Sequence, residues 1–478
     1  MNPPLRKLSL TVIVMFVTLM LAATYIQFFR ADALNADTRN ARTLYKEFGT
    51  ERGPIIVAGD AIASSTPTEG IYKYQRNYPA RDLYSHITGY FSVTHNSMTG
   101  LEKYGNSVLG GSDSSLWAQR IEDLFTGSQP QGGALALTID PAAQKAAYEA
   151  LAGRRGAVVA IDPQSGKILA LLSSPAFDPN GIATQDKKAA EQYWEEISAQ
   201  SDKPLLNRAL GDDLYPPGSI FKVITAAALL EEGASPESVI DAPTTWTLPE
   251  TNSVVHNTGG ACGDGSGKAS LRTALVESCN TAFAIAGANL GAEKLIATAE
   301  KFGFHKDLTT PLPVRPSRLP KPASKAALAM DAFGQQDVQV SPLQMALVAA
   351  AIANNGEMMQ PYLIDKVLSA DFAPVSQTSP TVLASPISSA TAQYLSSMMQ
   401  DAVEKNYGAR VQVPGIKVAG KTGTAEVGGA KSPHAWFIGF EAAENSRVAV
   451  AVFIENGGYG IESAAPVAKA VMNAVVNK

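Results

Sequence analysis

An uncharged, mostly apolar run of 22 residues spans positions 8–29 near the amino terminus. As a helix it would be ~33 Å long, just over the ~30 Å hydrocarbon core of a bilayer. Arg6 and Lys7 precede the run, which favours a cytoplasmic amino terminus, although Arg30 on the far side weakens that asymmetry. The pattern predicts a short cytoplasmic leader (1–7), a single transmembrane helix and an extracytoplasmic remainder of the chain.

A cleaved signal peptide is the alternative interpretation of this apolar run. The tripeptide Ala31-Asp32-Ala33 has the small-x-small form of a cleavage site. However, the apolar core of a signal peptide is usually only ~7–15 residues long. We therefore expect an anchor that is retained in the cell membrane.

Residues 30–154 form a front part with short elements. Short β-like runs lie between Thr50 and Ser65, and alternating apolar residues from Gly132 to Asp140 predict a strand. A helix is expected over Pro141–Leu151, because proline suits the first turn of a helix. No cluster of titratable residues stands out here, so the expected role of this part is a spacer or pedestal.

Residues 155–478 follow a different pattern, with strands at both ends and helices between them. Gly156–Ile161 and Lys167–Leu172 predict a hairpin around a turn-rich pentapeptide. Three further strands are expected near the carboxyl end, at Gly415–Val427, Ala435–Phe440 and Arg447–Glu455. The helices expected are Ile220–Glu232, one capped by Ser270, Ala292–Phe302, Ser341–Gly356, Ser389–Glu404 and Pro466–Val476. This order predicts an α+β domain built on one antiparallel sheet.

Composition narrows the classes of partner. The formal net charge is −5 and the pI is near 5.7, which gives no reason to expect nucleic acid as a partner. None of the five histidines lies in a close metal-binding spacing, and no Cys-x-x-Cys pair is present. We therefore expect no metal and no cofactor.

The two cysteines, Cys262 and Cys279, lie 17 residues apart. Outside the cytoplasm a disulfide between them could persist, and closing such a loop is worth about 3 kcal/mol. Two buried free thiols are the alternative. We favour the disulfide, which would also brace the residues on either side of Cys279.

A serine and a lysine one helical turn apart form the first candidate for chemistry. Ser219 follows Pro216-Pro217-Gly218 at the start of a predicted helix, where backbone N–H groups favour a developing negative charge. Lys222 lies on the same helix face. A serine hydroxyl needs a base to become a nucleophile, and a lysine can be that base if its pKa is lowered. Ser-x-x-Lys alone is a weak signal, since serine is also a common helix cap.

Two further motifs follow in order along the chain. Ser278 and Asn280 offer a hydroxyl for proton relay and an amide for a substrate carbonyl, although such a polar triplet often only caps helices. Lys421 would bring positive charge near the serine, and the glycine at Gly423 would let a substrate strand approach closely. The hydroxyls of Thr422 and Thr424 could hold a terminal carboxylate. The backbone N–H of Thr424 could share an oxyanion hole with that of Ser219.

Together the three motifs resemble those of penicillin-binding proteins and serine β-lactamases. The resemblance to class B penicillin-binding proteins covers nearly the whole chain, and it is closest to an actinobacterial group. It rests on the segments Arg52–Ile55, Gly156–Pro163, Pro204–Ala209, Tyr215–Ser219, Ala261–Asp264, Ser278–Phe283, Val340–Gln344 and His434–Phe437. The middle residue of the second motif is Cys279, where many relatives have aspartate, which puts any role of a carboxylate there in doubt.

The resemblance implies a monofunctional peptidoglycan D,D-transpeptidase. It implies a penicillin-binding transpeptidase fold, with helices on the faces of the sheet and an all-helical subdomain. Ser219 would attack the D-Ala–D-Ala bond of a stem peptide, Lys222 would be its base, and β-lactams would acylate the same serine. Ser278, Asn280 and Lys421 would complete the proton and binding network, and Thr422, Gly423 and Thr424 would line the substrate strand. The implied role is in cell-wall growth, in cell shape or division, beside a membrane glycan polymerase.

Three alternatives remain open from the sequence. A serine β-lactamase needs a base for water, often in a Glu-x-x-x-Asn loop, and that pattern does not occur between Ser278 and Lys421. A non-catalytic β-lactam sensor or scaffold would be expected to carry more membrane spans or a cytoplasmic signalling segment. A D,D-carboxypeptidase, which uses water as acceptor, is hardly separable from a transpeptidase by sequence.

Overall fold

The computed structural model describes residues 3–30, 48–70, 72–117, 121, 125–127, 131–308, 310–429 and 431–477. Its first helix, α1 (Pro3–Thr24), continues as a π-helical turn, η1 (Tyr25–Phe29). Within the described residues this is the one helix whose length and composition would allow it to cross a membrane, with a mean hydropathy of 2.2. None of its residues is buried against the protein, as expected for a helix whose partner is lipid. The possible cleavage site Ala31-Asp32-Ala33 lies outside the described residues.

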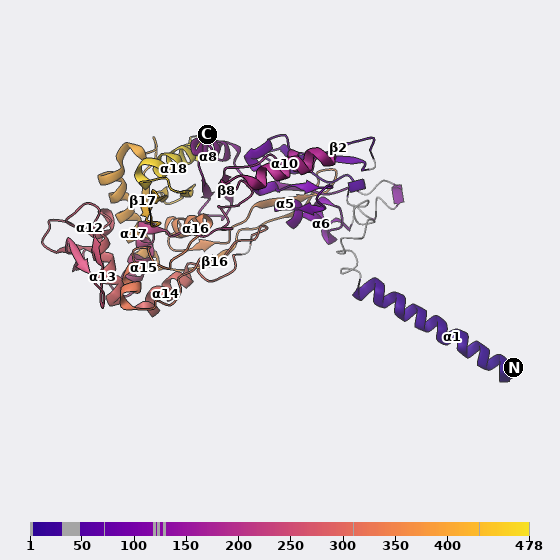
Figure 1. Cartoon of the computed structure of the whole chain (residues 1–478), viewed down its shortest axis with the longest axis horizontal. Coiled ribbons are helices and arrows are strands. Elements are labelled where there is room, and N and C mark those ends of the chain that lie inside the picture. The colour runs from indigo at the N-terminus through magenta and orange to yellow at the C-terminus, as the bar shows by residue number, and fades with distance from the viewer. Residues whose placement is uncertain are drawn as a thin grey trace.

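The front part is built on a six-stranded sheet, in the order β15-β14-β6-β1-β2-β3. Strands β1 and β6 are parallel, and the other neighbours are antiparallel. Two of the strands come from far along the chain, which the sequence did not predict; in Figure 1 their orange ribbon runs beside the purple front part. The strands are β1 (Ile55–Val57), β2 (Asp60–Pro67), β3 (Tyr74–Asn77), β6 (Ala134–Leu137), β14 (Ile364–Leu368) and β15 (Pro374–Gln377).

A cluster of buried charges stabilises this front part, so the expectation that none stands out there was wrong. Glu102, in α5 (Gly100–Tyr104), accepts hydrogen bonds from Arg52 Nε at 2.5 Å and from Arg76 Nε at 2.7 Å. All three side chains are almost fully buried. The Tyr78 hydroxyl donates to the same carboxylate at 3.2 Å. The cluster is hidden in the sequence because its members lie at least 24 residues apart, except for Arg76 and Tyr78.

The second domain has the antiparallel sheet that the sequence predicted, in the order β17-β18-β19-β7-β8. The hairpin and the three strands near the carboxyl end are confirmed, and the order leaves β17 at an open edge. The strands are β7 (Gly156–Ile161), β8 (Ile168–Ser174), β17 (Val418–Ala425), β18 (His434–Glu441) and β19 (Ala449–Ile454). Every residue of β18 and β19 is buried, so both faces of the sheet are covered.

Helices from distant parts of the chain pack on the sheet. On one face lie α8 (Pro141–Leu151) and α18 (Gly460–Val476), which contact each other and appear together in Figure 1. On the other lies α16 (Pro342–Ala353), every residue of which is buried. The last helix was predicted to begin at Pro466, but it begins at Gly460. Proline usually marks a first turn, whereas Pro466 lies inside this helix at the cost of one backbone hydrogen bond.

The active-site side of the domain is mainly helical. A short 3-10 turn, η4 (Gly218–Ile220), leads into α11 (Lys222–Glu231), where the sequence predicted one continuous helix. The other helices on this side are α12 (Leu271–Val276), α13 (Asn280–Leu290), α14 (Ala292–Lys301), α15 (Lys325–Asp331) and α17 (Ser389–Ala402). Short two-stranded sheets accompany them: β9 (Val239–Asp241) with β12 (Lys268–Ser270), β10 (Thr245–Thr247) with β11 (Val254–His256), and β13 (Met358–Met359) with β16 (Val382–Ala384). Two more helices, α9 (Pro179–Ala183) and α10 (Lys187–Ala199), lie beside the front part, where α10 appears near β2 in Figure 1.

Candidate active site

The turn that carries Ser219 is pressed against the open end of β17. Gly218, just before it, has a φ of +56° and donates its N–H to the Gly334 carbonyl at 2.8 Å. A Cβ on Gly218 would lie only 2.6 Å from the carbonyl oxygen of Thr424, so only glycine allows this approach. Trp436 on β18 fixes the preceding segment, since its indole N–H donates to the Pro216 carbonyl at 3.0 Å. Ser219 itself is half-buried beside the third motif.

Lys222, the first residue of α11, is completely buried. Its Nζ donates to the Ser278 carbonyl at 2.6 Å, to Asn280 Oδ1 at 2.7 Å and to Ser278 Oγ at 3.2 Å. The amine also lies over the rings of Phe283 (5.8 Å) and Phe333 (6.0 Å), which exclude water from it. The structure therefore brings the first and second motifs into direct contact.

Lys421 reaches the same point from the sheet. It is fully buried, and its Nζ donates to Ser278 Oγ at 2.8 Å and to the Thr422 carbonyl at 3.0 Å. Two lysine amines thus share one serine hydroxyl. Ser278 has a φ of +60°, a conformation that is costly for a residue with a Cβ and that is typical of functional sites.

The electrostatics of this group follow from burial and like charge. Burial lowers the pKa of Lys222 well below its usual value, and the charge of Lys421 lowers it further. Burial also lowers the pKa of Lys421, but its electrostatic interaction and hydrogen bond with the Tyr407 side chain oppose that shift. The surroundings therefore favour loss of the proton from Lys222, whereas Tyr407 favours retention of the proton on Lys421; a base and an electrostatic stabiliser require this difference.

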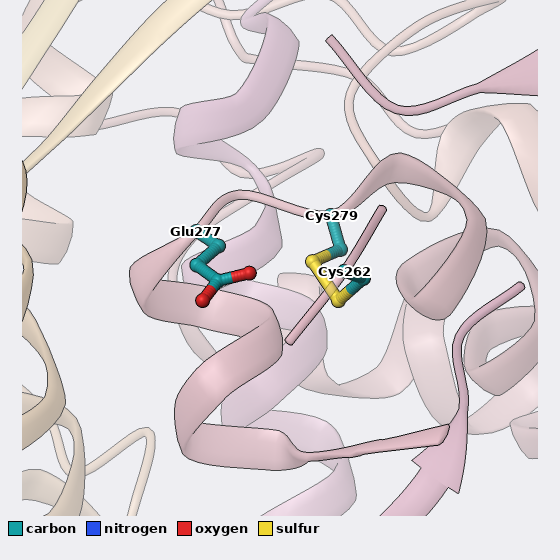
Figure 2. A group of neighbouring side chains, drawn as sticks. All are labelled: Cys262, Glu277 and Cys279. Atoms are coloured by element: carbon teal, nitrogen blue, oxygen red, sulfur yellow. A yellow bond between two sulfur atoms is a disulfide. The ribbon is translucent and has the colours of Figure 1, made fainter. Parts of the chain in front are cut away.

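The second motif is held from outside by a disulfide between Cys262 and Cys279 (Figure 2). The Cα atoms of the two residues are 5.9 Å apart. Next to it, the Gly263 N–H donates to the Glu277 carboxylate at 2.7 Å. The two sulfurs and this carboxylate lie close enough to suggest a metal site. Because the sulfurs are bonded to each other, they are not thiolate ligands. The disulfide and the Gly263–Glu277 hydrogen bond instead form a structural clasp, which fixes the loop at residues 262–263 to residues 277–279.

Loop contacts complete the clasp around Asn280. The Asn280 Nδ2 donates to the His256 carbonyl at 2.9 Å, while its Oδ1 accepts from Lys222. The next residue, Thr281, donates its N–H to Asn257 Oδ1 at 3.0 Å. Loop 256–263 therefore fixes both the backbone and the amide of the second motif.

The glycine of the third motif has a packing role that the sequence did not predict. A Cβ on Gly423 would lie 2.9 Å from the Pro217 carbonyl oxygen and 3.0 Å from Ile220 Cγ2. The packing of the Ser219 turn against β17 thus requires a glycine here, and the approach of a substrate strand at Gly423 stays a prediction. Thr422 and Thr424 are both half-buried and stay candidates for substrate contacts.

Sequence reasoning missed three residues that the structure brings to the site. Tyr407 accepts a hydrogen bond from the Thr422 N–H at 3.3 Å, Trp436 holds Pro216, and Phe333 shields Lys222. Tyr407 and Phe333 have no sequence signal of their own, and Trp436 has only the resemblance of its segment, which assigns it no role; each acts through a position that only the folded chain creates.

Comparison with known proteins places this geometry in a family. Residues 156–473 match the model described as the penicillin binding protein transpeptidase domain. Residues 52–135 match the penicillin binding protein A dimerisation domain. The two matches lie within the front part and the second domain predicted from the sequence.

Relatives of similar length support the match. The chain is 40% identical to the peptidoglycan D,D-transpeptidase PbpA of Mycolicibacterium smegmatis over 100% of both chains, and 41% identical to PbpA of Mycobacterium tuberculosis over 100% of this chain and 99% of the relative.

Solved structures agree with this. Penicillin-binding protein A from M. tuberculosis, in its ceftriaxone acyl-enzyme complex, superposes with a TM-score of 0.87 at 40% identity, covering 90% of this chain and 100% of that one. Its penicillin G acyl-enzyme complex gives a TM-score of 0.84, covering 89% and 99%. With 40% identity over its full length and a matching transpeptidase domain, the chain belongs to the penicillin-binding protein family of transpeptidases.

Proposed function

We propose that the protein is a membrane-anchored, serine-type peptidoglycan D,D-transpeptidase that is acylated by β-lactams. The observation that carries the proposal is that Lys222 and Lys421 both donate to the Ser278 hydroxyl. Lys222 itself follows Ser219 by three residues, about one helical turn. A buried lysine whose nearest charged partner is a second lysine is costly for the fold, and a catalytic base accounts for that cost.

In the acylation step, neutral Lys222 accepts the proton of the Ser219 hydroxyl. The Ser219 oxygen attacks the carbonyl carbon of the penultimate D-Ala and forms a tetrahedral intermediate. The backbone N–H groups of Ser219 and Thr424 stabilise the oxyanion, and Lys421 adds positive charge nearby. The C–N bond then breaks, and Ser278 relays a proton from the lysines to the leaving D-Ala amine. A β-lactam follows the same course, except that its leaving nitrogen stays attached through the opened ring.

In the second step, an amino group of a neighbouring stem peptide attacks the acyl-enzyme. Lys222 takes up the proton of that amine, directly or through Ser278, and the Ser219 oxygen regains its proton as the ester bond breaks. The products are the cross-linked peptide and free enzyme. Asn280 holds the substrate carbonyl, since its amide is already oriented by His256 and Lys222.

The substrate strand is assigned to the open edge of β17. An edge strand offers unpaired backbone groups to an extended peptide, which is the usual mode of strand addition. The hydroxyls of Thr422 and Thr424 are assigned to the terminal carboxylate of the substrate. Gly423 allows β17 to lie close to the Ser219 turn.

The proposed location rests on the apolar helix α1, and the proposed partner rests on analogy with relatives. We assign α1 to a single membrane span with a cytoplasmic amino terminus, so that the catalytic domain faces the cell wall. By analogy with class B relatives, a membrane glycan polymerase is the proposed partner, and the activity is assigned to cell-wall growth or division.

Labelling with a fluorescent penicillin tests this function. We expect a long-lived covalent adduct on the wild-type protein and none on Ser219→Ala. A wild-type protein that turns penicillin over rapidly would be a β-lactamase, and one that releases D-Ala from a stem peptide without joining it to an acceptor amine would be a carboxypeptidase. If the folded wild-type protein formed no adduct, a non-catalytic scaffold would be the remaining interpretation.

A further inference from the structure

The end of α17 contains a π-helical turn, η5 (Val403–Tyr407), directly behind the candidate active site. Wide turns of this kind are rare in helices and often occur at functional sites. Gly408 ends the turn with a φ of +48°. Tyr407 points into the protein core, where only 7% of the residue is exposed.

Two consecutive side chains of this turn contact the segment before the second motif and the third motif itself. Asn406 Nδ2 donates to the Val276 carbonyl at 2.6 Å, two residues before Ser278. The Tyr407 hydroxyl accepts from the Thr422 N–H at 3.3 Å and also interacts with the amine of Lys421. The turn therefore ties the loop of the second motif to the strand of the third.

The contact with Thr422 also has a geometric consequence for the strand edge. β17 pairs with β18 on one side only, so an N–H bonded to Tyr407 belongs to the open side. Tyr407 occupies that edge at Thr422. A substrate strand can then pair with β17 only from Thr424 onward, which is where the Ser219 turn approaches.

We propose that Tyr407 is a positioning residue that orients the Lys421 ammonium and closes the β17 edge at Thr422, so that the substrate registers on Thr424. This proposal rests on the proposed transpeptidase function and deepens it. The titratable groups near the Lys421 amine are Tyr407 on η5, which raises the pKa of Lys421, and Lys222 on α11, which shares the Ser278 hydroxyl with it. Removal of the phenol hydroxyl takes away the interaction that favours charged Lys421, while burial continues to disfavour that charge.

The test compares Tyr407→Phe with Tyr394→Phe, a matched change at an exposed tyrosine of α17. The rate of acylation by a fluorescent penicillin is measured across pH in the full-length protein. Tyr407→Phe should lower the rate roughly 10-fold or more, because a hydrogen bond to a charged group is lost. Its alkaline limb should move to lower pH, because Lys421 loses its proton more easily. Tyr394→Phe should match the wild type.

A second variant, Asn406→Ala, removes the tie to Val276 but keeps the phenol, and should slow acylation without moving the alkaline limb. Thermal unfolding of each variant is followed in parallel. An unmoved limb in Tyr407→Phe, with a rate that is unchanged or uniformly lower, would overturn the proposal. A wild type that forms no adduct would overturn the proposed function instead, so the two failures are distinguishable.

Discussion

Two clusters of buried charge in this molecule have opposite compositions. In the front part, Glu102 lies between Arg52 and Arg76, and each guanidinium is within 2.7 Å of the carboxylate. In the active site, Lys222 and Lys421 both point at one serine hydroxyl. Both clusters are shielded from water, so the difference lies in the sign of the neighbouring charges.

That difference decides what each group does. Burial would raise the pKa of Glu102, but Arg76 and Arg52 outweigh it and hold the pKa below its usual value. Burial lowers the pKa of Lys222, and Lys421 lowers it further. A buried group beside opposite charge keeps its own charge and holds the fold together, whereas one beside like charge is ready to lose it and can act as a base.

The largest effect expected is on activity, in Lys222→Met. Removal of the base should lower the rate of acylation by about 10²–10⁴-fold. The free energy of unfolding should stay the same or rise, because a buried amine is replaced by an apolar side chain of similar length. Lys188→Met, at an exposed lysine of α10, is the control and should change neither quantity. Near-normal acylation of Lys222→Met would remove the base from the mechanism.

The matching change in the other cluster is Glu102→Gln. It leaves two buried guanidinium groups without their carboxylate, and the free energy of unfolding should fall by about 3–5 kcal/mol. The acylation rate of the folded fraction should not change, since Glu102 belongs to the pedestal. Glu149→Gln, which loses only an exposed pair with Lys145, should cost less than about 1 kcal/mol. Chemical denaturation measures both, and equal losses would show that the cluster is not important for stability.

Loss of the disulfide tests how far the active site depends on its clasp. Replacement of both Cys262 and Cys279 by serine should lower the free energy of unfolding by about 3 kcal/mol. It should also slow acylation, because Ser278 and Asn280 flank Cys279 and both contact Lys222. Denaturation and penicillin labelling separate the two effects. An unchanged acylation rate in the double variant would mean that loop hydrogen bonds alone hold the motif.

A buried carboxyl without a cation sharpens the comparison at the smallest scale. Burial raises the pKa of Asp331 to about 7, and the charge of Asp337 adds to the shift, although the Asp337 and Val338 N–H groups oppose it. The folded state therefore favours the neutral acid. The contribution of protonated Asp331 to the free energy of unfolding is complete below pH ~4 and is lost as the pH rises to about 7.

Asp331→Asn, which stays neutral, should therefore be more stable than the wild type at pH 8, on the order of 1–3 kcal/mol, and similar to it at pH 4. Thermal unfolding at the two pH values measures this. A variant that is less stable than the wild type at pH 8 would show that the charged form makes a contact the fold needs.

Local pattern was sufficient for most elements of the second domain and for the candidate residues of the site. Alternation predicted β19, caps predicted α12 and α16, and the three motifs identified Ser219, Lys222, Ser278 and Lys421, because each of these signals lies within a few consecutive residues. Local pattern failed where partners are distant. Glu102 was overlooked since its arginines lie 50 and 26 residues away, and Tyr407 since its hydroxyl meets β17 only in the fold.

The sequence by itself therefore determined the inventory: an apolar helix long enough for a membrane, an antiparallel sheet and a set of nucleophile, amines and amide in a fixed order. Only the tertiary structure decided how these groups act on one another. It moved two late strands into the pedestal sheet, packed Gly423 against the Ser219 turn and placed a second cation beside Lys222. The physical reason is that pairing, desolvation and charge interaction depend on distances in space, which the order of residues along a chain does not specify.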